Sequence, residues 1–144
     1  MWRSFVGVLV TLALGGCVSS VLIGPLPTVS DPTHAAEIVV IREHRFTGSG
    51  RTDPITLDGV EIYHLRVGEH VVMKVNPGDH IVGIRYRNIT FLWEEVTVLV
   101  RTEQRQSYYF RIDPGYAHPL VNAVTPEKGR ALMSTTTRIS PSEP

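Results

Sequence analysis

Apolar and polar residues alternate with a period of two along most of the chain between residues 38 and 112. This period is typical of β-strands that bury one face, because successive side chains of a strand point to opposite sides of the sheet. No window of twelve residues carries a helical pattern of apolar positions. The pattern therefore predicts an all-β fold, a small antiparallel β-sandwich of about six or seven strands. The expected strands cover residues 38–41, 60–67, 71–75, 81–86, 96–100 and 108–112.

Turn residues separate the expected strands. Asp58-Gly59 precedes one strand, Gly68-Glu69 separates two, and Asn76-Pro77-Gly78-Asp79 has Pro and Gly where a type II turn requires them. Hairpins at the last two turns would form a meander with one apolar face, because loop length decides which face each residue takes. The residues expected on this inner face are Leu65, Val71, Met73, Val75, Val82, Ile84 and Tyr86, continued by Val96, Val98, Val100, Tyr108, Phe110 and Ile112.

Glu94 conflicts with the alternation, because it falls on the same face as the core residues Val96 and Val98 although its side chain is charged. A β-bulge near Trp93-Glu94-Glu95 would resolve it, because one extra residue in the strand turns Trp93 inward. We favour the bulge, and the alternative is an exposed Trp93 at a binding edge.

Charge excludes one class of partner. The chain has 14 basic and 14 acidic side chains, and the basic residues do not cluster in runs. Nucleic-acid binding needs a Lys/Arg-rich surface that neutralises phosphates. No nucleic-acid partner is therefore expected.

The N-terminus has the layout of a secretory signal peptide, with Arg3 ahead of a mostly apolar run over residues 5–14. The run closes with Leu14-Gly15-Gly16-Cys17, which resembles the lipobox of bacterial lipoproteins. The resemblance implies removal of a lipoprotein signal peptide, residues 1–16, and lipidation of Cys17, which anchors the chain in a membrane without a spanning segment. The alternatives are an ordinary buried thiol or an uncleaved spanning helix, although a span needs about 20 apolar residues.

The residue after the cysteine bears on localisation. In the lipoproteins of Gram-negative bacteria, an aspartate at that position favours retention in the inner membrane. Here the position is Val18. The resemblance therefore implies a lipid anchor in the outer membrane, with the protein facing the periplasm.

The segments that flank the expected sandwich are rich in turn residues. Residues 17–36 hold the candidate lipid site and three prolines, which predicts a flexible tether. The sandwich domain is expected over residues 37–138, a length that suits one domain with one core. Residues 139–144 end a stretch rich in Ser, Thr and Pro that begins at Thr135, and they predict a disordered tail.

Familiar catalytic motifs are missing from the sequence, among them the Gly-x-Ser-x-Gly elbow, the phosphate-binding loop, His-Glu-x-x-His and Cys-x-x-Cys. The meander would place His64 and His70 diagonally across one hairpin, but two surface histidines without a third ligand are usually solvated polar residues. Each of four aspartates adjoins Pro or Gly, which favours a role in turns. We therefore expect no enzyme, no metal and no cofactor. The four aspartates are Asp53, Asp58, Asp79 and Asp113.

Two aromatic residues are candidates for contact with a partner or glycan. Tyr108 and Tyr109 are adjacent, so on a strand they point to opposite faces. Tyr108 has the parity of the core, and Tyr109 is then exposed. An exposed Tyr109 together with Trp93 would form a possible partner contact.

Residues 38–112 resemble the small lipoprotein domains of the DUF2846 type, and in style the PEGA and transthyretin-like sandwiches. This resemblance implies an anchored β-sandwich whose turns face the periplasm, and the family brings no assigned biochemical activity. The segments that carry it are Ile38-Val39-Val40-Ile41-Arg42, Leu57-Asp58-Gly59, Leu65-Arg66-Val67-Gly68, Val75-Asn76-Pro77-Gly78-Asp79-His80 and Tyr108-Tyr109-Phe110.

The favoured function is a lipid-anchored, non-catalytic module for interaction with envelope protein partners or for envelope assembly. A periplasmic binding module for a small molecule, glycan or metal is the alternative, and a concave cluster of Trp93, Tyr109 and a histidine would support it. A secretion-system lipoprotein is a further alternative, because such machines use outer-membrane lipoproteins with small sandwiches. A hydrolase would need a close Asp/His or Ser/His pair in one cleft.

Overall fold

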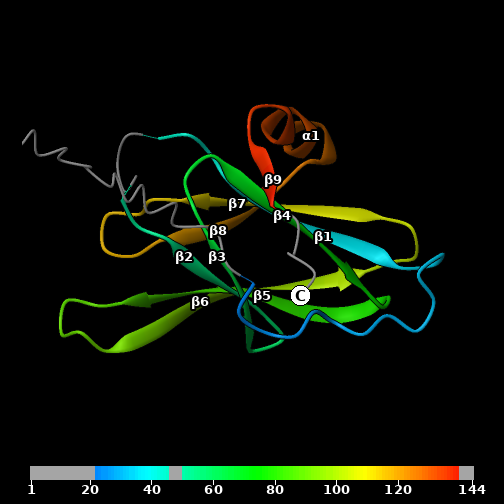
Figure 1. Cartoon of the computed structure of the whole chain (residues 1–144), viewed down its shortest axis with the longest axis horizontal. Coiled ribbons are helices and arrows are strands. Elements are labelled where there is room, and N and C mark those ends of the chain that lie inside the picture. The colour runs from blue at the N-terminus through cyan, green and yellow to red at the C-terminus, as the bar shows by residue number, and fades with distance from the viewer. Residues whose placement is uncertain (1–21, 46–49, 140–144) are drawn as a thin grey trace, which may run out of the picture.

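The computed structural model describes residues 22–45 and 50–139, which form nine strands and one short helix. The strands make two stacked sheets, and the helix lies on the outer side of one of them (Figure 1). The all-β sandwich predicted from the alternation is confirmed, with more strands than expected. The elements are β1 Ala36–Arg42, β2 Asp53–Leu57, β3 Val60–Leu65, β4 Glu69–Val75, β5 Gly78–Arg87, β6 Trp93–Thr102, β7 Ser107–Asp113, β8 Leu120–Val124, α1 Pro126–Ser134 and β9 Thr137–Ile139.

One sheet has five strands in the order β8-β7-β1-β4-β9, and the other has four strands in the order β3-β2-β5-β6. All pairs of the four-stranded sheet are antiparallel. In the five-stranded sheet, β1 is parallel to β7 and β4 is parallel to β9, while the other pairs are antiparallel. The sandwich is therefore largely antiparallel, with two parallel pairs in one layer.

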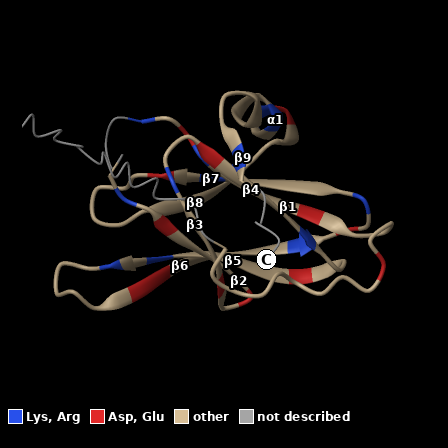
Figure 2. Ribbon diagram, in the orientation of Figure 1, with Lys and Arg blue, Asp and Glu red and all other residues tan. Residues whose placement is uncertain are grey.

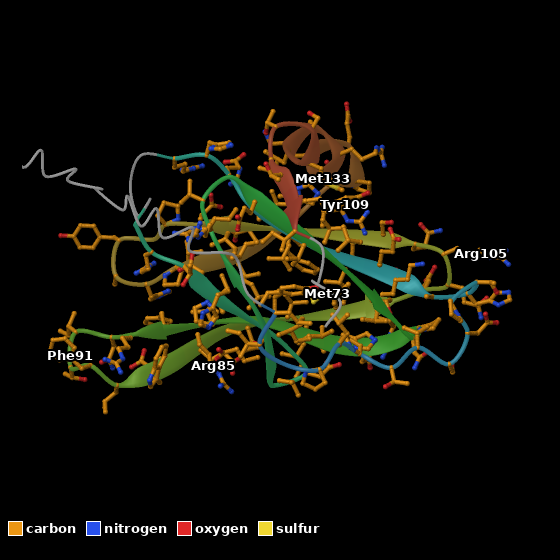
Figure 3. All side chains as sticks on the ribbon, viewed as in Figure 1. Met73, Arg85, Phe91, Arg105, Tyr109 and Met133 are labelled. Carbon is orange, nitrogen blue, oxygen red and sulfur yellow. The ribbon has the colours of Figure 1, made fainter. Side chains whose placement is uncertain are left out.

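The apolar side chains expected on the inner face fill the space between the sheets. Met73 lies at the centre of this core (Figure 3). Three valines of β6 and Tyr108 pack against the core while half-buried, and Tyr86 is half-buried further along β5. The predicted inner face is confirmed for eight residues, all of which are buried: Leu65, Val71, Met73, Val75, Val82, Ile84, Phe110 and Ile112.

The meander through β3, β4 and β5 was wrong. β3 and β5 belong to the four-stranded sheet, whereas β4 pairs with β1 in the five-stranded sheet. The turns at Gly68-Glu69 and Asn76-Pro77-Gly78-Asp79 carry the chain from one layer to the other, so they do not close hairpins. The inner face was still predicted correctly, because residues that face each other across a sandwich obey the same alternation as residues that share one face. Asp58-Gly59 does close a hairpin, between β2 and β3, with φ of 52° and 79° as in a type I′ turn.

A helix, which the sequence pattern did not predict, covers the outer face of the five-stranded sheet. The Thr125 side chain accepts a hydrogen bond from the Lys128 N–H, and Pro126 opens the helix at a position where its missing N–H costs nothing. Leu132 of α1 buries itself against Val39 and Ile41 of β1. At 9 residues the helix is shorter than the window in which a helical pattern was sought.

The predicted tether contacts the domain at several points. From Leu22 onward the segment is in contact, since the Ile23 N–H donates to the Ile62 carbonyl at 2.8 Å and the Ser30 N–H donates to Asn76 Oδ1 at 3.0 Å. Asn76 Nδ2 donates in turn to the Thr28 carbonyl. The segment therefore contacts the sheets at Ile23, Thr28 and Ser30, and the flexibility of the tether stays a prediction.

The remaining terminal predictions fall mostly outside the described residues. The signal peptide 1–16, Cys17 and residues 140–144 lie there. The domain extends slightly beyond both predicted bounds, since β1 begins at Ala36 and β9 ends at Ile139. Within the described part of the chain, no helix has the length and apolar character needed to cross a membrane.

A buried ion pair joins the two layers. Arg42 at the end of β1 lies 3.1 Å (Nε to Oδ2) from Asp53 at the start of β2, and its Nη1 donates to the Leu65 carbonyl at 2.9 Å. Burial lowers the pKa of the Arg42 guanidinium, and the charge of Asp53 opposes that shift. Asp53 is therefore a core partner of an arginine, and the turn role expected for it was wrong.

Candidate interaction site

The β5–β6 hairpin ends in a five-residue loop whose shape is set by Asn88. The side-chain Oδ1 of Asn88 accepts hydrogen bonds from the Thr90 N–H at 2.9 Å, the Thr90 hydroxyl at 2.7 Å and the Leu92 N–H at 3.0 Å. The Asn88 N–H donates to the Leu92 carbonyl, and the Phe91 N–H donates to the Asn88 carbonyl. These polar bonds hold Phe91 at a φ of 63°, in the left-handed region that non-glycine residues rarely adopt.

Four large apolar side chains project from this loop and the first residue of β6, and we call them the hairpin tip: Ile89, Phe91, Leu92 and Trp93. Their exposed fractions are 94%, 77%, 65% and 59%. Phe91 lies at the far end of the four-stranded sheet and points away from the body (Figure 3). Contiguous exposed apolar groups of this kind mark interaction surfaces in soluble domains.

The tip is not needed to hold its own loop together. The hydrogen bonds that define the loop come from Asn88 and the backbone, while the apolar side chains remain in solvent. Apolar surface gains roughly 25 cal/mol per Å² when it is removed from water. That free energy is unused in the folded monomer, so it is available to a partner that covers the tip.

Charged residues flank the tip on both strands. The hairpin carries a basic segment on one strand and an acidic segment on the other, behind an uncharged end (Figure 2). The Arg87 guanidinium carbon lies 5.1 Å from the centre of the Trp93 ring, a cation–π contact that fixes the indole against β5. Trp93 is therefore held in place and still half open to solvent.

A groove lies beside the tip on the outer face of the four-stranded sheet. Its volume is about 570 Å³, and a second hollow of about 250 Å³ shares His64, Arg85 and Trp93 with it. The His64 ring nitrogen Nε2 lies 2.8 Å from Glu61 Oε1, and Arg85 Nη1 lies 3.5 Å from Glu61 Oε2. The groove therefore combines one aromatic face with partnered polar groups. Its larger part is lined by Glu61, His64, Arg85, Trp93, Glu94 and Glu95.

Glu94 stays ionised at the base of the tip. The hydroxyl of Tyr86 donates to Glu94 Oε2, and Asn88 Nδ2 donates to Oε1 at 2.5 Å. These two hydrogen bonds hold the pKa of Glu94 below its ordinary value, and the bond from Tyr86 has the larger effect. The same bond raises the pKa of Tyr86. The pair links β5 to β6 directly behind the apolar loop.

The predicted bulge at Trp93 was wrong. The pairing of β5 with β6 runs without a break from Gly78 opposite Thr102 to Arg87 opposite Trp93. Glu94 keeps the parity of the core face, but its carboxylate meets Tyr86 and Asn88 and is exposed. A charged residue is tolerated on this face because the core ends before this part of the hairpin. Trp93 accordingly matches the alternative of an exposed residue.

Tyr109 is not available to a partner. It is 8% exposed and belongs to the small apolar cluster of Val39, Ile41 and Leu132 under α1. It lies between the sheet and the helix, near Met133 (Figure 3). Its parity was predicted correctly, since it points away from the main core, but the helix covers the face on which it lies. The structure therefore does not bring Trp93 and Tyr109 together.

The histidines are dispersed. His64 lies on the outer face of β3, whereas His70 of β4 is buried in the other sheet, where its Nδ1 lies 2.7 Å from the Thr136 hydroxyl. The diagonal pair of His64 and His70 was therefore wrong. His80 bonds to the Asn76 carbonyl at 2.7 Å and to Asp58 at 2.8 Å. Among residues 22–45 and 50–139, no three His, Cys, Asp or Glu side chains are grouped as metal ligands.

Ile89, Phe91 and Leu92 were not recognised as candidates from the sequence. The signal was present, because Asn88-Ile89-Thr90-Phe91-Leu92-Trp93 places apolar residues between two strands where a loop normally has polar ones.

Comparisons of the chain with protein-family models, with curated proteins and with solved structures found no match.

Proposed function

We propose that this chain is an outer-membrane-anchored, periplasm-facing lipoprotein that acts as a non-catalytic interaction module, and that the hairpin tip binds an envelope protein. The observation that supports the proposal is the tip itself: polar bonds around Asn88 fix a loop that holds Phe91 and its apolar neighbours in solvent. Rigid presentation lowers the entropy cost of association, because little ordering remains to be done on binding.

The anchor in this proposal rests on Leu14-Gly15-Gly16-Cys17 and its resemblance to a lipobox. Leu22 forms a bridge to Tyr63 of β3, and four residues, 18–21, lie between it and the candidate lipid site in the sequence. Five Cα–Cα steps span at most about 18 Å. A lipid on Cys17 would therefore hold the β3 edge of the domain close to the bilayer.

Site-specific photo-crosslinking in intact envelopes tests the tip. A photoreactive side chain at Phe91 is expected to form a discrete adduct with one envelope protein, because Phe91 is the outermost aromatic of the tip. The matched control carries the same group at Arg130, an exposed residue of α1. The adduct should disappear in an Ile89→Ser, Leu92→Ser background that leaves membrane recovery unchanged. Equal adducts at Phe91 and Arg130 would contradict the proposal.

Replacement of the lipid site tests the anchor separately. Cys17→Ser is expected to abolish labelling with a fatty-acid analogue and to release the chain from membranes. Ser19→Cys in the same background is the control, because it restores a thiol without the preceding Leu-Gly-Gly pattern. A Cys17→Ser protein that stays in the membrane without acylation would mean that the N-terminal segment spans the bilayer.

The groove beside Trp93 supports a second candidate function, a periplasmic binding module for a glycan. A sugar ring can stack on the exposed indole face while His64 and Arg85 supply polar contacts. Titration of the domain with envelope glycan fragments should give saturable binding that Trp93→Ala removes and Tyr116→Ala, at a different exposed aromatic, retains. Binding that is unchanged in Trp93→Ala would exclude this groove.

The relationship to DUF2846-type domains is part of the same proposal. It rests on the segments quoted within residues 38–112. An anchored all-β sandwich is what that resemblance implies.

A further inference from the structure

The two sheets end in four edge strands, β3, β6, β8 and β9, which differ in length and in how far other segments pair with them. The edge of β3 is paired in part by the segment at Leu22 and Ile23. β8 has 5 residues and β9 has 3, so both edges are short. β6 has 10 residues, and within the described part of the chain its only strand neighbour is β5. One long edge is therefore left open.

An open edge of this length is a template for pairing. Every second residue of an edge strand directs its backbone N–H and C=O away from the sheet. Natural proteins usually block such an edge with proline, charged side chains, a bulge or a covering segment. β6 has no proline and no bulge in its register with β5, and its charged residues are Glu94, Glu95 and Arg101. Its backbone can therefore accept another strand whose charges match these residues.

The inner face of β6 also lacks complete cover. Val96, Val98 and Val100 pack against the core but remain half-buried. A cleft of about 400 Å³ opens at this side, lined mainly by apolar residues of β6, β7 and β8, by Pro126 of α1 and by polar residues Glu103 and Gln106 of the β6–β7 turn. A strand added to β6 would extend the apolar inner face over this opening.

The charges of β6 are complementary to those of the same strand running in the opposite direction. Glu95 and Arg101 lie on the outer face, three residues on either side of Val98. An antiparallel pair with Val98 opposite Val98 sets Glu95 opposite Arg101 twice, and Val96 opposite Val100 twice. If the second β6 strand is shifted by one residue, its apolar residues point to the outer face of the joined sheet. Two neighbouring registers keep the faces: the one centred on Leu99 sets Glu95 against Glu103, and the one centred on Thr97 sets Glu95 against Leu99 and so loses both charge pairs.

We propose that β6 is a homodimer interface, in which two copies of this chain pair antiparallel about Val98 and join their four-stranded sheets into one continuous sheet. The contact is isologous, so both copies use the same strand and the assembly closes at two. The interface is centred on Val98 and shares only Trp93, the first residue of β6, with the hairpin tip, and it does not depend on the proposed envelope partner.

The ion pairs within one chain leave room for this contact. Arg101 donates to Asp79 through Nε at 2.7 Å and Nη2 at 2.9 Å, while its side chain is 80% exposed. A guanidinium has five N–H donors, so further donors remain for Glu95 of the second copy. Glu95 accepts from the Thr56 hydroxyl through Oε1. A carboxylate oxygen accepts more than one hydrogen bond, and Oε2 is the second acceptor.

Charge reversal tests the register. The full chain is examined in density-matched detergent by sedimentation equilibrium, as Glu95→Arg, as Arg101→Glu, as the double variant, and as a mixture of the two single variants. Each single variant sets like charges against each other twice, so its self-association should weaken by about tenfold or more. The double variant and the equimolar mixture restore opposite charges at both pairs and should recover dimers. Arg130→Glu on α1 is the matched control, with unchanged association.

The recovery by mixing protects the test from misfolding, because Arg101→Glu also loses its partner Asp79. A native chain that is monomeric across the concentration range would overturn the proposal. Dimers that persist in both single variants would also overturn it, because the interface would then lie elsewhere. An Ile89→Ser, Leu92→Ser protein should dimerise normally, so that failure of the hairpin-tip proposal and failure of this one give different results.

Discussion

The two edges of the four-stranded sheet are finished in different ways. At the β3 edge, Ile62, Tyr63 and Leu65 are at most 1% exposed, the N-terminal segment pairs with the backbone, and Arg42 reaches across from the other layer. At the β6 edge the inward valines are half-buried, Leu99 is 69% exposed and the hairpin tip projects into solvent.

This difference separates two tasks within one sheet. The β3 side buries its apolar surface within the monomer, so that surface contributes to folding stability. The β6 side leaves apolar surface and backbone groups unused, so they remain available for association. Substitutions on the first side should therefore change stability, and those on the second side should change binding.

The largest expected effect comes from breaking the closed side at Arg42. Arg42→Ala removes the buried partner of Asp53 and leaves it the largely exposed Arg51, whose Nη2 lies 3.3 Å from Oδ1, so the free energy of unfolding should fall by about 3–5 kcal/mol. Arg101→Ala, which breaks the exposed pair with Asp79 on the open side, should cost about 1 kcal/mol or less. Urea unfolding of both proteins measures the difference. Similar losses in the two variants would contradict the division between the sides.

A smaller effect is expected where the N-terminal segment meets β3. A Cβ added at Gly24 would lie 2.0 Å from the Glu61 carbonyl oxygen, so the segment must move. Gly24→Ala should cost about 1–3 kcal/mol and speed hydrogen exchange of the Ile23 amide. Gly50→Ala is the control, because nothing lies within 4 Å of its added Cβ. If the Ile23 amide stays protected in Gly24→Ala, the N-terminal segment does not contact β3 in the way described here.

The pH dependence of stability should differ between His70 and His80. Burial, and then the charge of Arg138, lower the pKa of His70 below its ordinary value of 6.5. The unfolded chain then binds a proton that the folded chain does not, so this stability is complete above pH 6.5 and is lost as the pH falls below it.

For His80 the sign is opposite. Burial alone would lower its pKa, but hydrogen bonds to the Asn76 carbonyl and to Asp58 raise it above 6.5. Its contribution is complete below pH 6.5 and is lost as the pH rises through the raised folded-state value. On acidification from pH 7.5 to about 5.5, His70→Gln should therefore lose less stability than the native chain, and His80→Gln should lose more. Thermal unfolding at several pH values measures both slopes, and equal slopes would contradict the assignment.

The smallest effect on stability is expected on the open side. Phe91→Ser and Leu99→Ser replace exposed residues and should change the free energy of unfolding by about 0.5 kcal/mol or less. Ile62→Ala on the closed side removes a side chain that is 1% exposed and should cost about 2–5 kcal/mol. Thermal unfolding compares the three. A large loss in Phe91→Ser would mean that the hairpin tip supports the fold of the monomer.

Sequence reasoning succeeded where the rule is local. The two-residue period placed Met73, Val75 and Val82 on the core face, and Asp58-Gly59 closes a hairpin because both residues accept positive φ. It failed where the answer depends on how far the core extends. The alternation places Glu94 on the core face and thus predicts a bulge, but it does not show that the core ends before Glu94 while the strand pairing continues.

The candidate site shows the same limit. Trp93 and Tyr109 both have the outward parity of a possible contact residue. Tyr109 is covered by α1, which packs Gly129 directly against its ring, whereas Trp93 is covered only by Arg87. A distant segment makes this difference, and no pattern around either aromatic residue reveals it.

The sequence by itself determined the all-β class, the inner set of apolar residues and the candidate lipid site at Cys17, because alternation, turn chemistry and the lipobox pattern are all read over a few neighbouring residues. The tertiary structure decided which layer each strand joins, which outward residue is covered and which edge stays open. Burial of apolar surface has no direction of its own, so many pairings satisfy the same alternation. Only contacts between distant segments, such as Arg42 with Asp53 and α1 with β7, select one of them.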